Sequence, residues 1–337
     1  MAKNVTIKDI AAEAGVSVSL VSFVMNNKVG PDGKRRYRVS NETRDRILEI
    51  SRRLNYQPNI AARALRSGRT KVIGAVLPEI SNVFYGKISK NLEAISMREG
   101  YTILIGSSDE LKENQERIIR SFMDKGVEGF IVVPSEGSED SINQILSHSI
   151  PCVFLDRQDM DVPVPKVVLD NREAMAKGVE TLHRDRGVRS IEMISYTFNY
   201  SSMVEREEGY KAKMEELGLG EFVKVHHVDF GNIDKEVMDL MPDFLERKVE
   251  GLVFATNSLT IAALKAMAEH GVTVQKDLFV MGFDNSDVYE VFRPVIPHVQ
   301  QPLDEICEKA MDILLGIISG KREQASEVIT VEGKVVS

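Results

Sequence analysis

The chain of 337 residues is poor in cysteine, the residue that forms the disulfides of small secreted domains and holds many structural metals. It has only two cysteines, Cys152 and Cys307, each inside an apolar or amphipathic stretch with no partner at metal-ligand spacing. That scarcity argues against a disulfide framework and against a zinc site. We expect both cysteines to be plain core residues, and we expect no metal site and no cofactor.

Long apolar runs and catalytic signatures are missing as well. No stretch of 18 apolar residues could span a bilayer, and no early apolar run looks like a secretory signal. We therefore expect a cytoplasmic protein. The sequence contains no G-x-G-x-x-G, G-x-x-x-x-G-K-[ST], H-E-x-x-H or G-x-S-x-G motif, and its six histidines are scattered. His226 and His227 are adjacent, so in a strand they would point to opposite faces. We expect no catalytic residue and no enzymatic activity.

The net charge of −8 hides a split between the two ends of the chain. Through Lys71 there are 15 Lys and Arg against 6 Asp and Glu, a net of +9, and the remainder carries −17. Such asymmetry is typical of a nucleic-acid-binding head on a body with a different task. The alternative is that these charges only solvate a terminal arm, which would require the segment to lack a helical pattern.

The basic segment does have a helical pattern. Apolar residues recur at helical spacing over 7–14, behind Thr6 as a helix cap, and again over 18–25, behind Ser17 as a second cap. Gly15 lies between the two stretches and can adopt a positive φ without steric cost. Two short helices joined by a turn of this kind predict a helix-turn-helix, and a third apolar-patterned stretch after residue 40 would close its core.

Two strings in this region closely resemble the head of the lactose-repressor (LacI/GalR) family of transcription regulators. They read VTIKDIA at 5–11 continuing into AGVSVS at 14–19, and LNYQPNIAARAL at 54–65. The resemblance implies a sequence-specific regulator that reads a near-palindromic double-stranded DNA operator as a homodimer, since no heptad-bearing tail follows the last strand. It places at the DNA the residues Thr6, Ser17, Val18, Ser19, Ser22, Phe23, Asn26, Tyr56, Asn59, Ala62, Leu65 and Arg66.

The reading surface departs from the family pattern in two places. Phe23 stands where the family commonly has an arginine that reads guanine, so Phe23 either faces the DNA or packs on the head's own core. The loop 27–39 is longer than usual and basic, which suits either phosphate contacts or simple solvation. By resemblance, Leu65 is a minor-groove wedge, and the alternative is a linker with an apolar side chain.

The body of the chain alternates short apolar runs with amphipathic helices such as 85–99 and 113–125. We expect strands over 72–77, 102–105, 129–133, 152–155, 191–195, 223–228, 251–254 and 279–282. This alternation predicts two doubly wound parallel sheets, and ligands bind such sheets beyond the carboxyl ends of their strands. The expected fold is therefore an all-α helix-turn-helix head on an α/β two-lobed body, which by resemblance is like that of periplasmic binding proteins.

The expected domains are a head over 1–57, a hinge over 58–70, a first lobe over 71–169 with 300–325, and a second lobe over 170–299 with 326–337. By resemblance the cleft between the lobes binds a small effector, a carbohydrate in most of the family. The implied effector contacts are Asn82, Phe84, Tyr85, Asp156, Arg157, Arg206, Phe230, Asn257, Asp284 and Gln301. The Thr256-Asn257 pair departs from the family's Asn-Asp, which weakens any transfer of ligand identity. A soluble sugar-binding protein and a sugar-processing enzyme are the alternatives.

Overall fold

The computed structural model describes residues 5–25, 39–56, 68–198 and 200–337. It divides into two compact units, Met1–Thr70 and Lys71–Ser337. Predictions for the basic loop up to residue 38 and for Asn26, Asn59, Ala62, Leu65 and Arg66 lie outside the described residues.

The described part of the first unit contains the helices α1 (Ile7–Ala14), α2 (Val18–Met25) and α3 (Asn41–Arg53). The expected local signals are present. The Asp9 carboxylate accepts hydrogen bonds from the backbone N–H and the hydroxyl of Thr6, both at 2.7 Å. Gly15 has φ +64°, and the Ser17 hydroxyl accepts from the N–H of Leu20 at 3.2 Å. The helix-turn-helix predicted from the sequence is confirmed.

The core of this unit is built from one face of each helix, as amphipathic spacing requires. Its buried members are Ile10, Ala11, Ala14, Val21, Val24, Ile47 and Ile50. Because α2 turns Val21 and Val24 inward, its first residues lie on the outer surface, and the Val18 side chain is 41% exposed. The start of the second helix is thus available to a partner.

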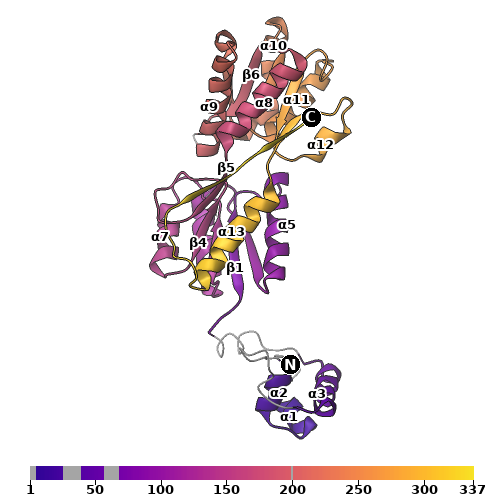
Figure 1. The fold of residues 1–337 in the computed structure, drawn as a ribbon, viewed down its shortest axis with the longest axis vertical. Helices are drawn as coiled ribbons and strands as arrows, with labels where there is room; N and C mark the ends of the chain where they lie inside the picture. The colour runs from indigo at the N-terminus through magenta and orange to yellow at the C-terminus, as the bar shows by residue number, and fades with distance from the viewer. Residues whose placement is uncertain (1–4, 26–38, 57–67, 199) are drawn as a thin grey trace. The chain divides into compact units, whose positions relative to one another are not determined.

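Two six-stranded sheets organise the second unit (Figure 1). The first has the order β11-β5-β4-β3-β1-β2 and the second the order β12-β10-β9-β8-β6-β7, so the strands follow one another in the same spatial order in both sheets. All pairings are parallel except that between β10 and β12. The first sheet contains β1 (Val72–Leu77), β2 (Thr102–Ser107), β3 (Gly129–Val132), β4 (Cys152–Leu155), β5 (Lys166–Leu169) and β11 (Val328–Val331). The second contains β6 (Ile191–Tyr196), β7 (Val225–Val228), β8 (Gly251–Phe254), β9 (Phe279–Phe283), β10 (His298–Gln300) and β12 (Lys334–Val336).

Helices cover both faces of each sheet, as a parallel sheet requires. In the first lobe, α5 (Val83–Arg98) and α13 (Leu303–Ile318) share one apolar cluster, and α6 (Lys112–Asp124) and α7 (Glu139–Ser147) share the other. The second lobe carries α8 (Asn171–Arg186), α9 (Ser201–Glu216), α10 (Ile233–Glu246), α11 (Asn257–Glu269) and the short α12 (Asp287–Val291). Two 3₁₀ turns, η1 (Gly220–Phe222) and η2 (Phe230–Asn232), flank β7. None of the helices in the described residues is long and apolar enough to cross a membrane.

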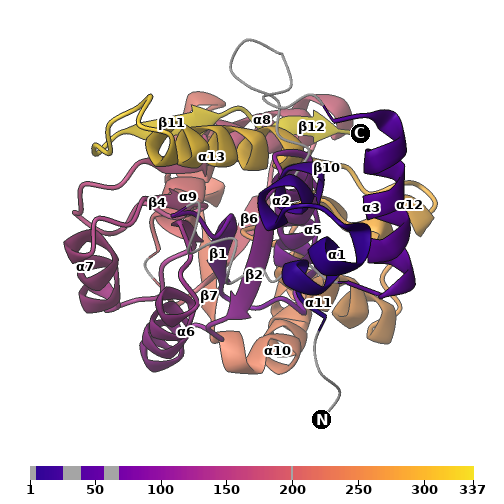
Figure 2. The same cartoon turned by 90° about the horizontal axis from the view of Figure 1, so that it is seen from below.

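The last segment of the chain corrects one expected boundary. Residues 326–337 were assigned to the second lobe, but β11 pairs in parallel with β5 of the first sheet, from Val328 opposite Lys166 to Val331 opposite Leu169. Only β12 joins the second sheet. In Figure 1 the yellow C-terminal ribbon runs from the first lobe to the second, and Figure 2 labels its two strands β11 and β12. Val331 of β11 is one of the buried residues of the apolar cluster under α5 and α13 in the first lobe.

Both cysteines lie in the first lobe and have free thiols. Cys152 belongs to the cluster under α6 and α7, and Cys307 to the cluster under α5 and α13. Burial raises the pKa of both thiols, that of Cys307 to about 12. The expectation that they are core residues is therefore confirmed.

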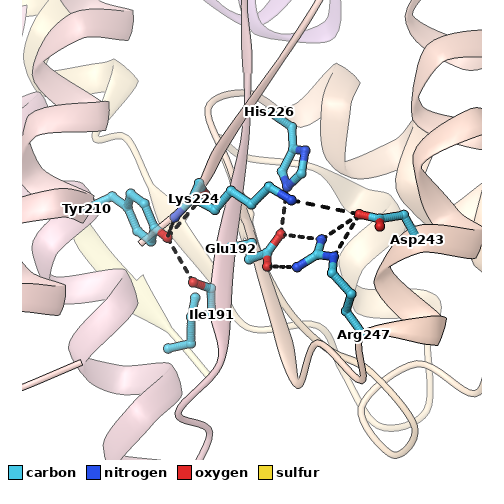
Figure 3. Close-up of polar contacts among 7 residues, drawn as sticks. All are labelled: Ile191, Glu192, Tyr210, Lys224, His226, Asp243 and Arg247. Carbon is cyan, nitrogen blue, oxygen red and sulfur yellow. Dashed lines mark hydrogen bonds and ion pairs between the residues drawn. The ribbon is translucent and has the colours of Figure 1, made fainter. Parts of the chain in front are cut away.

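A charged cluster lies near the edge of the second sheet around Glu192 of β6, which is only 4% exposed (Figure 3). Its carboxylate accepts from His226 Nε2 at 2.6 Å and from both terminal nitrogens of Arg247, one of them at 2.9 Å. Asp243 holds Arg247 from the other side at 2.7 Å. Burial alone would raise the pKa of Glu192, but the hydrogen bonds from His226 and Arg247 lower it to about 2. His227 points to the opposite face and contacts Glu207 of α9 at 2.8 Å, as alternation in a strand predicts.

We expect this cluster to make the stability of the protein fall in acid. A carboxyl group whose folded pKa lies below its unfolded value stabilises the fold above the unfolded pKa, and that contribution disappears as the pH falls toward the folded pKa. For Glu192 the window runs from the ordinary value of 4.5 down to about 2. Glu192→Gln should therefore cost about 3 kcal/mol of unfolding free energy at pH 7 and much less at pH 2.5.

Urea denaturation of both proteins across this pH range measures the effect. Glu246→Gln, at an exposed site on α10, is the matched control and should change stability little at any pH. A loss in E192Q that stays constant from pH 7 to pH 2.5 would contradict the assignment.

Candidate functional site

A pocket lies between the two lobes, beyond the carboxyl ends of several strands, and is lined from both sheets. It encloses about 700 Å³ of space free of atoms, a volume that includes the open solvent at its mouth. The structure brings all ten sequence-predicted effector residues together in its lining. They are Asn82, Phe84, Tyr85, Asp156, Arg157, Arg206, Phe230, Asn257, Asp284 and Gln301. Their contacts with a ligand remain a prediction.

Two aspartates occupy equivalent places in the two lobes. Asp156 directly follows β4 and Asp284 directly follows β9, and these strands hold the same position in their sheets. Both residues have left-handed backbones, with φ +69° and +65°. This conformation costs energy for a residue other than glycine, and such strain concentrates at functional sites. The result is that each lobe presents to the pocket one carboxylate held on a left-handed backbone directly after a strand.

Each carboxylate is held in place by a side chain from another element. Asp156 accepts from the Tyr85 hydroxyl at 2.9 Å, and Asp284 accepts from the Gln301 side-chain amide at 2.6 Å and from the N–H of Asn257 at 3.1 Å. Burial raises the pKa of Tyr85, and the Asp156 charge raises it further. Tyr85 therefore remains a protonated donor at neutral pH. Both carboxylates keep acceptor capacity for a ligand.

Arg206 of α9 is 3% exposed and rigidly oriented. Its Nε donates to the Asn171 side chain at 2.8 Å, its Nη1 donates to the Ala255 carbonyl at 2.6 Å, and its plane stacks 4.1 Å from the Phe283 ring centroid. The remaining terminal nitrogen has no hydrogen-bond partner among the described residues. Arg206 therefore offers the pocket one preorganised donor edge.

The guanidinium of Arg157 makes more hydrogen bonds within the protein than that of Arg206 does. Its two terminal nitrogens donate to the two carboxylate oxygens of Glu110 at 2.8 and 2.5 Å, and one of them also donates to the Pro134 carbonyl at 2.9 Å. Its guanidinium lies 3.8 Å from the ring centroid of Tyr200, which belongs to the second lobe. Burial works against the charge on Arg157, but Tyr85 and Glu110 raise its pKa. Arg157 is thus a charged group whose principal partner, Glu110, sequence reasoning missed.

Aromatic rings form one wall of the pocket. Tyr196, Phe198, Tyr200 and Phe230 make a continuous cluster with ring centroids 5.2–5.7 Å apart. The side chain of Phe230 is 39% exposed, so its ring remains accessible. Sequence reasoning identified Phe230 alone among these four. The alternation of aromatic residues that begins at the last residue of β6 was a usable signal for the other three.

Asn257, where the sequence departs from the family pattern, begins α11 behind a Thr256 cap. Its side chain is 7% exposed, and its carbonyl oxygen has no hydrogen-bond donor among the described residues. A buried acceptor without a donor costs about 1–3 kcal/mol. A hydroxyl or amino group of a ligand in the pocket would relieve that cost.

The predicted DNA-facing residues that the structure describes lie on the head. Thr6, Ser17, Val18 and Ser19 are exposed, while Ser22 and Phe23 are half-buried on α2. Tyr56 is half-buried and packs against the head's core. The half-buried position of Phe23 is compatible with both alternatives stated for it. Contact of these residues with DNA remains a prediction.

Comparisons with known proteins assign both units to described families. Residues 70–334 match the family model described as periplasmic binding proteins and sugar binding domain of LacI family, and residues 6–59 match that of bacterial regulatory proteins, lacI family. The chain is 30% identical to the HTH-type transcriptional regulator RegA of Clostridium saccharobutylicum, with 94% of this chain and 93% of RegA covered. It is 28% identical to catabolite control protein A of Priestia megaterium, with 92% of each chain covered.

Among solved structures, the lac repressor dimer bound to operator and the anti-inducer ONPF has the same fold. The TM-score is 0.83 at 20% sequence identity, and the match covers 99% of this chain and 98% of the repressor. The likeness extends over the head and both lobes.

Proposed function

The chain belongs to the lacI family of bacterial regulatory proteins and is a DNA-binding transcriptional regulator, and we propose that a carbohydrate bound between its lobes controls its binding to an operator. The observation that carries this proposal is the convergence of ten side chains, from helices and loops far apart in the sequence, on one inter-lobe pocket. The relatives are named as regulators, which supports a binding role for the pocket rather than a catalytic one.

The chemistry of the pocket suits a carbohydrate. The fixed carboxylates of Asp156 and Asp284 can each accept from ligand hydroxyls, and the free edge of Arg206 can donate to one. The wall containing Phe198 and Phe230 can cover the apolar face of a sugar ring. Polar groups at the edges and rings at one face are the pattern of an oriented small-molecule site.

Binding can be coupled to DNA through the arrangement of the lobes. Contacts already bridge them, including Lys87 to Asp287 at 3.1 Å and Gln158 to Glu205 at 2.5 Å. A ligand held by Asp156 and by Asp284 adds bonds to both lobes, so it favours the lobe arrangement in which those bonds form. The coupling is reciprocal, because a ligand that alters DNA affinity has its own affinity altered equally by DNA.

We further propose that the protein acts as a homodimeric repressor on near-palindromic double-stranded DNA. The lac repressor of the same fold binds its operator as a dimer, and two-fold symmetry in a protein calls for two half-sites in the DNA. In each head the exposed Val18 would contact a thymine methyl and Ser19 would donate or accept at a base edge. A regulator of this kind works where the chromosome lies, which favours a cytoplasmic location.

A thermal-shift screen of the full-length chain tests the effector class. Neutral sugars, sugar phosphates and nucleobases are compared, because a ligand that binds only the folded state raises the melting temperature. We expect a sugar to give the largest shift and to change the affinity of the protein for operator DNA. A shift given by a nucleobase and by no sugar would refute the carbohydrate proposal.

For the hinge we propose that Leu65 acts as a minor-groove wedge. Leu65→Ala should weaken binding to the operator about tenfold or more, and binding to unrelated DNA much less, because a wedge needs a deformable central step. Fluorescence anisotropy with the two duplexes measures both affinities. An equal loss on both DNAs would show that Leu65 belongs to a simple linker.

A further inference from the structure

The charged groups of the inter-lobe pocket do not balance. Among the described residues that line it, four are acidic, namely Glu79, Glu110, Asp156 and Asp284, and two are basic, namely Arg157 and Arg206. The excess is negative, although arginines in a pocket commonly serve to bind anions. The partners of the two arginines therefore determine which charge the pocket accepts.

Arg157 is occupied by Glu110. The pair is bidentate, with a third bond from Arg157 to the Pro134 carbonyl, and the Arg157 side chain is 6% exposed. A bidentate guanidinium–carboxylate pair uses the same paired donors that would otherwise hold a phosphate or a carboxylate. Arg157 thus lines the pocket with its charge already neutralised.

Glu110 is itself fixed by contacts from both lobes. Beyond Arg157, it accepts from the Tyr200 hydroxyl at 3.2 Å, and Tyr200 stacks on Arg157 at 3.8 Å. Glu110 comes from the loop after β2, and Tyr200 precedes α9 in the other lobe. The neutralised pair is therefore part of the wall that the two lobes build together.

The remaining polar groups of the pocket are rich in acceptors. Asp156 and Asp284 each accept from the protein and retain further acceptor capacity, and the carbonyl oxygen of Asn257 is buried without a donor. Against these stands one free edge of Arg206. A ligand that satisfies this set must bring several hydrogen-bond donors and no negative charge.

We propose that Glu110 determines the charge selectivity of the pocket, so that the effector is an uncharged, hydroxyl-rich ligand and phosphorylated or carboxylated sugars are excluded. The inference rests on the proposed function in so far as the ligand is a carbohydrate, whereas the exclusion of anions rests on the Arg157–Glu110 pair together with the carboxylates of Asp156 and Asp284. An anion in this pocket would face Asp156 and Asp284 at close range without an available guanidinium pair to compensate.

Matched ligand pairs and the Glu110→Gln variant test the proposal in the full-length chain. The pairs are glucose with glucose 6-phosphate, ribose with ribose 5-phosphate, and adenosine with its 5′-monophosphate, and inorganic phosphate is a fourth probe. Calorimetry on the wild type should detect a neutral member and at least tenfold weaker binding of its phosphate ester. The E110Q variant should bind the phosphate ester and inorganic phosphate each with at least tenfold higher affinity than the wild type does.

Glu79→Gln is the matched control, because it removes one negative charge from the same pocket without releasing an arginine. Glu79 contacts Ser81 at 2.5 Å rather than a guanidinium. An equal gain of affinity for anions in E79Q and E110Q would overturn the role of the Arg157–Glu110 pair. So would a wild-type protein that binds a phosphate ester as tightly as it binds the neutral ligand of the same pair. If E110Q does not bind phosphate more tightly than the wild type does, the proposal is wrong whatever the sugars do.

The reciprocal variant covers the case in which E110Q fails to fold. Arg157→Gln leaves the Glu110 carboxylate without its guanidinium. The ratio of the affinity for glucosamine to the affinity for glucose should therefore be at least tenfold higher in this variant than in the wild type. An unchanged ratio would overturn the proposal. If adenosine binds and no neutral sugar binds, the carbohydrate assignment is wrong. The affinity of E110Q for phosphate then still decides whether Glu110 determines charge selectivity.

Discussion

Operator affinity is expected to fall at least a thousandfold when the salt concentration rises from about 50 to about 200 mM. The reason is the split of charge, since the chain carries +9 through Lys71 and −17 beyond it. Each phosphate that a Lys or Arg neutralises releases condensed counterions, and two heads acting together would make about 6–10 such contacts. The strongly acidic body contributes no attraction, so the whole electrostatic term comes from the basic segment.

Fluorescence anisotropy with a labelled operator duplex at several KCl concentrations gives the slope of log affinity against log salt. Arg66→Gln should reduce the magnitude of that slope by about 1 per protomer, because one phosphate contact is lost. Arg186→Gln, at an exposed site on α8 of the body, is the matched control and should leave the slope unchanged. A flat salt response would mean that the basic segment does not make the contact with DNA.

Asp284→Asn is expected to weaken effector binding by about 30–100-fold. A hydrogen bond to a charged acceptor contributes about 1.5–3 kcal/mol, and the asparagine also turns one acceptor into a donor that faces Gln301 or the N–H of Asn257. Asparagine is a conservative choice because it tolerates the left-handed backbone, φ +65°, better than other residues. The fold should therefore be retained, and the loss should come from the ligand contact.

The measurement is calorimetry with the sugar that the thermal-shift screen identifies, together with operator binding in its absence. Asp109→Asn is the control, since Asp109 also has a left-handed backbone, φ +52°, but is exposed and lies outside the pocket. The control should bind the effector as the wild type does. Unchanged effector affinity in D284N would remove Asp284 from the site.

The sequence predicted most of the strands, because a buried parallel strand is a short apolar run flanked by turn residues. All eight expected strands are present, with ends shifted by at most two residues. Two internal strands, β5 and β10, were missed. β5 is only four residues long and includes Lys166, whose ammonium is buried and donates to the Met160 carbonyl at 2.7 Å, so no apolar pattern marks its start. β10 has only three residues, one of them the buried His298.

The ten effector positions were named from the sequence by resemblance to the lacI family, and those that directly follow strands lie together because the carboxyl ends of parallel strands converge at one edge of a sheet. Asp156 and Asp284 illustrate this, since each comes directly after the strand that holds the same position in its own sheet. The chemistry of Arg157 could not be named in the same way. Its partner Glu110 lies 47 residues away, in the loop after β2. In the sheet, β1 and β3 lie between β2 and β4, so the contact depends on the order of the strands and on the reach of that loop across two strands.

Local properties of the chain, namely helix periodicity, caps and apolar runs, thus specify the helices of the head and the strands and helices of the two lobes, because each depends on residues close together in sequence. The pairing of Arg157 with Glu110 and Tyr200, and the return of β11 to the first sheet, follow from the order of strands and the closeness of the lobes. Charge neutralisation between distant loops depends on distances in space, and periodicity carries no information about those distances.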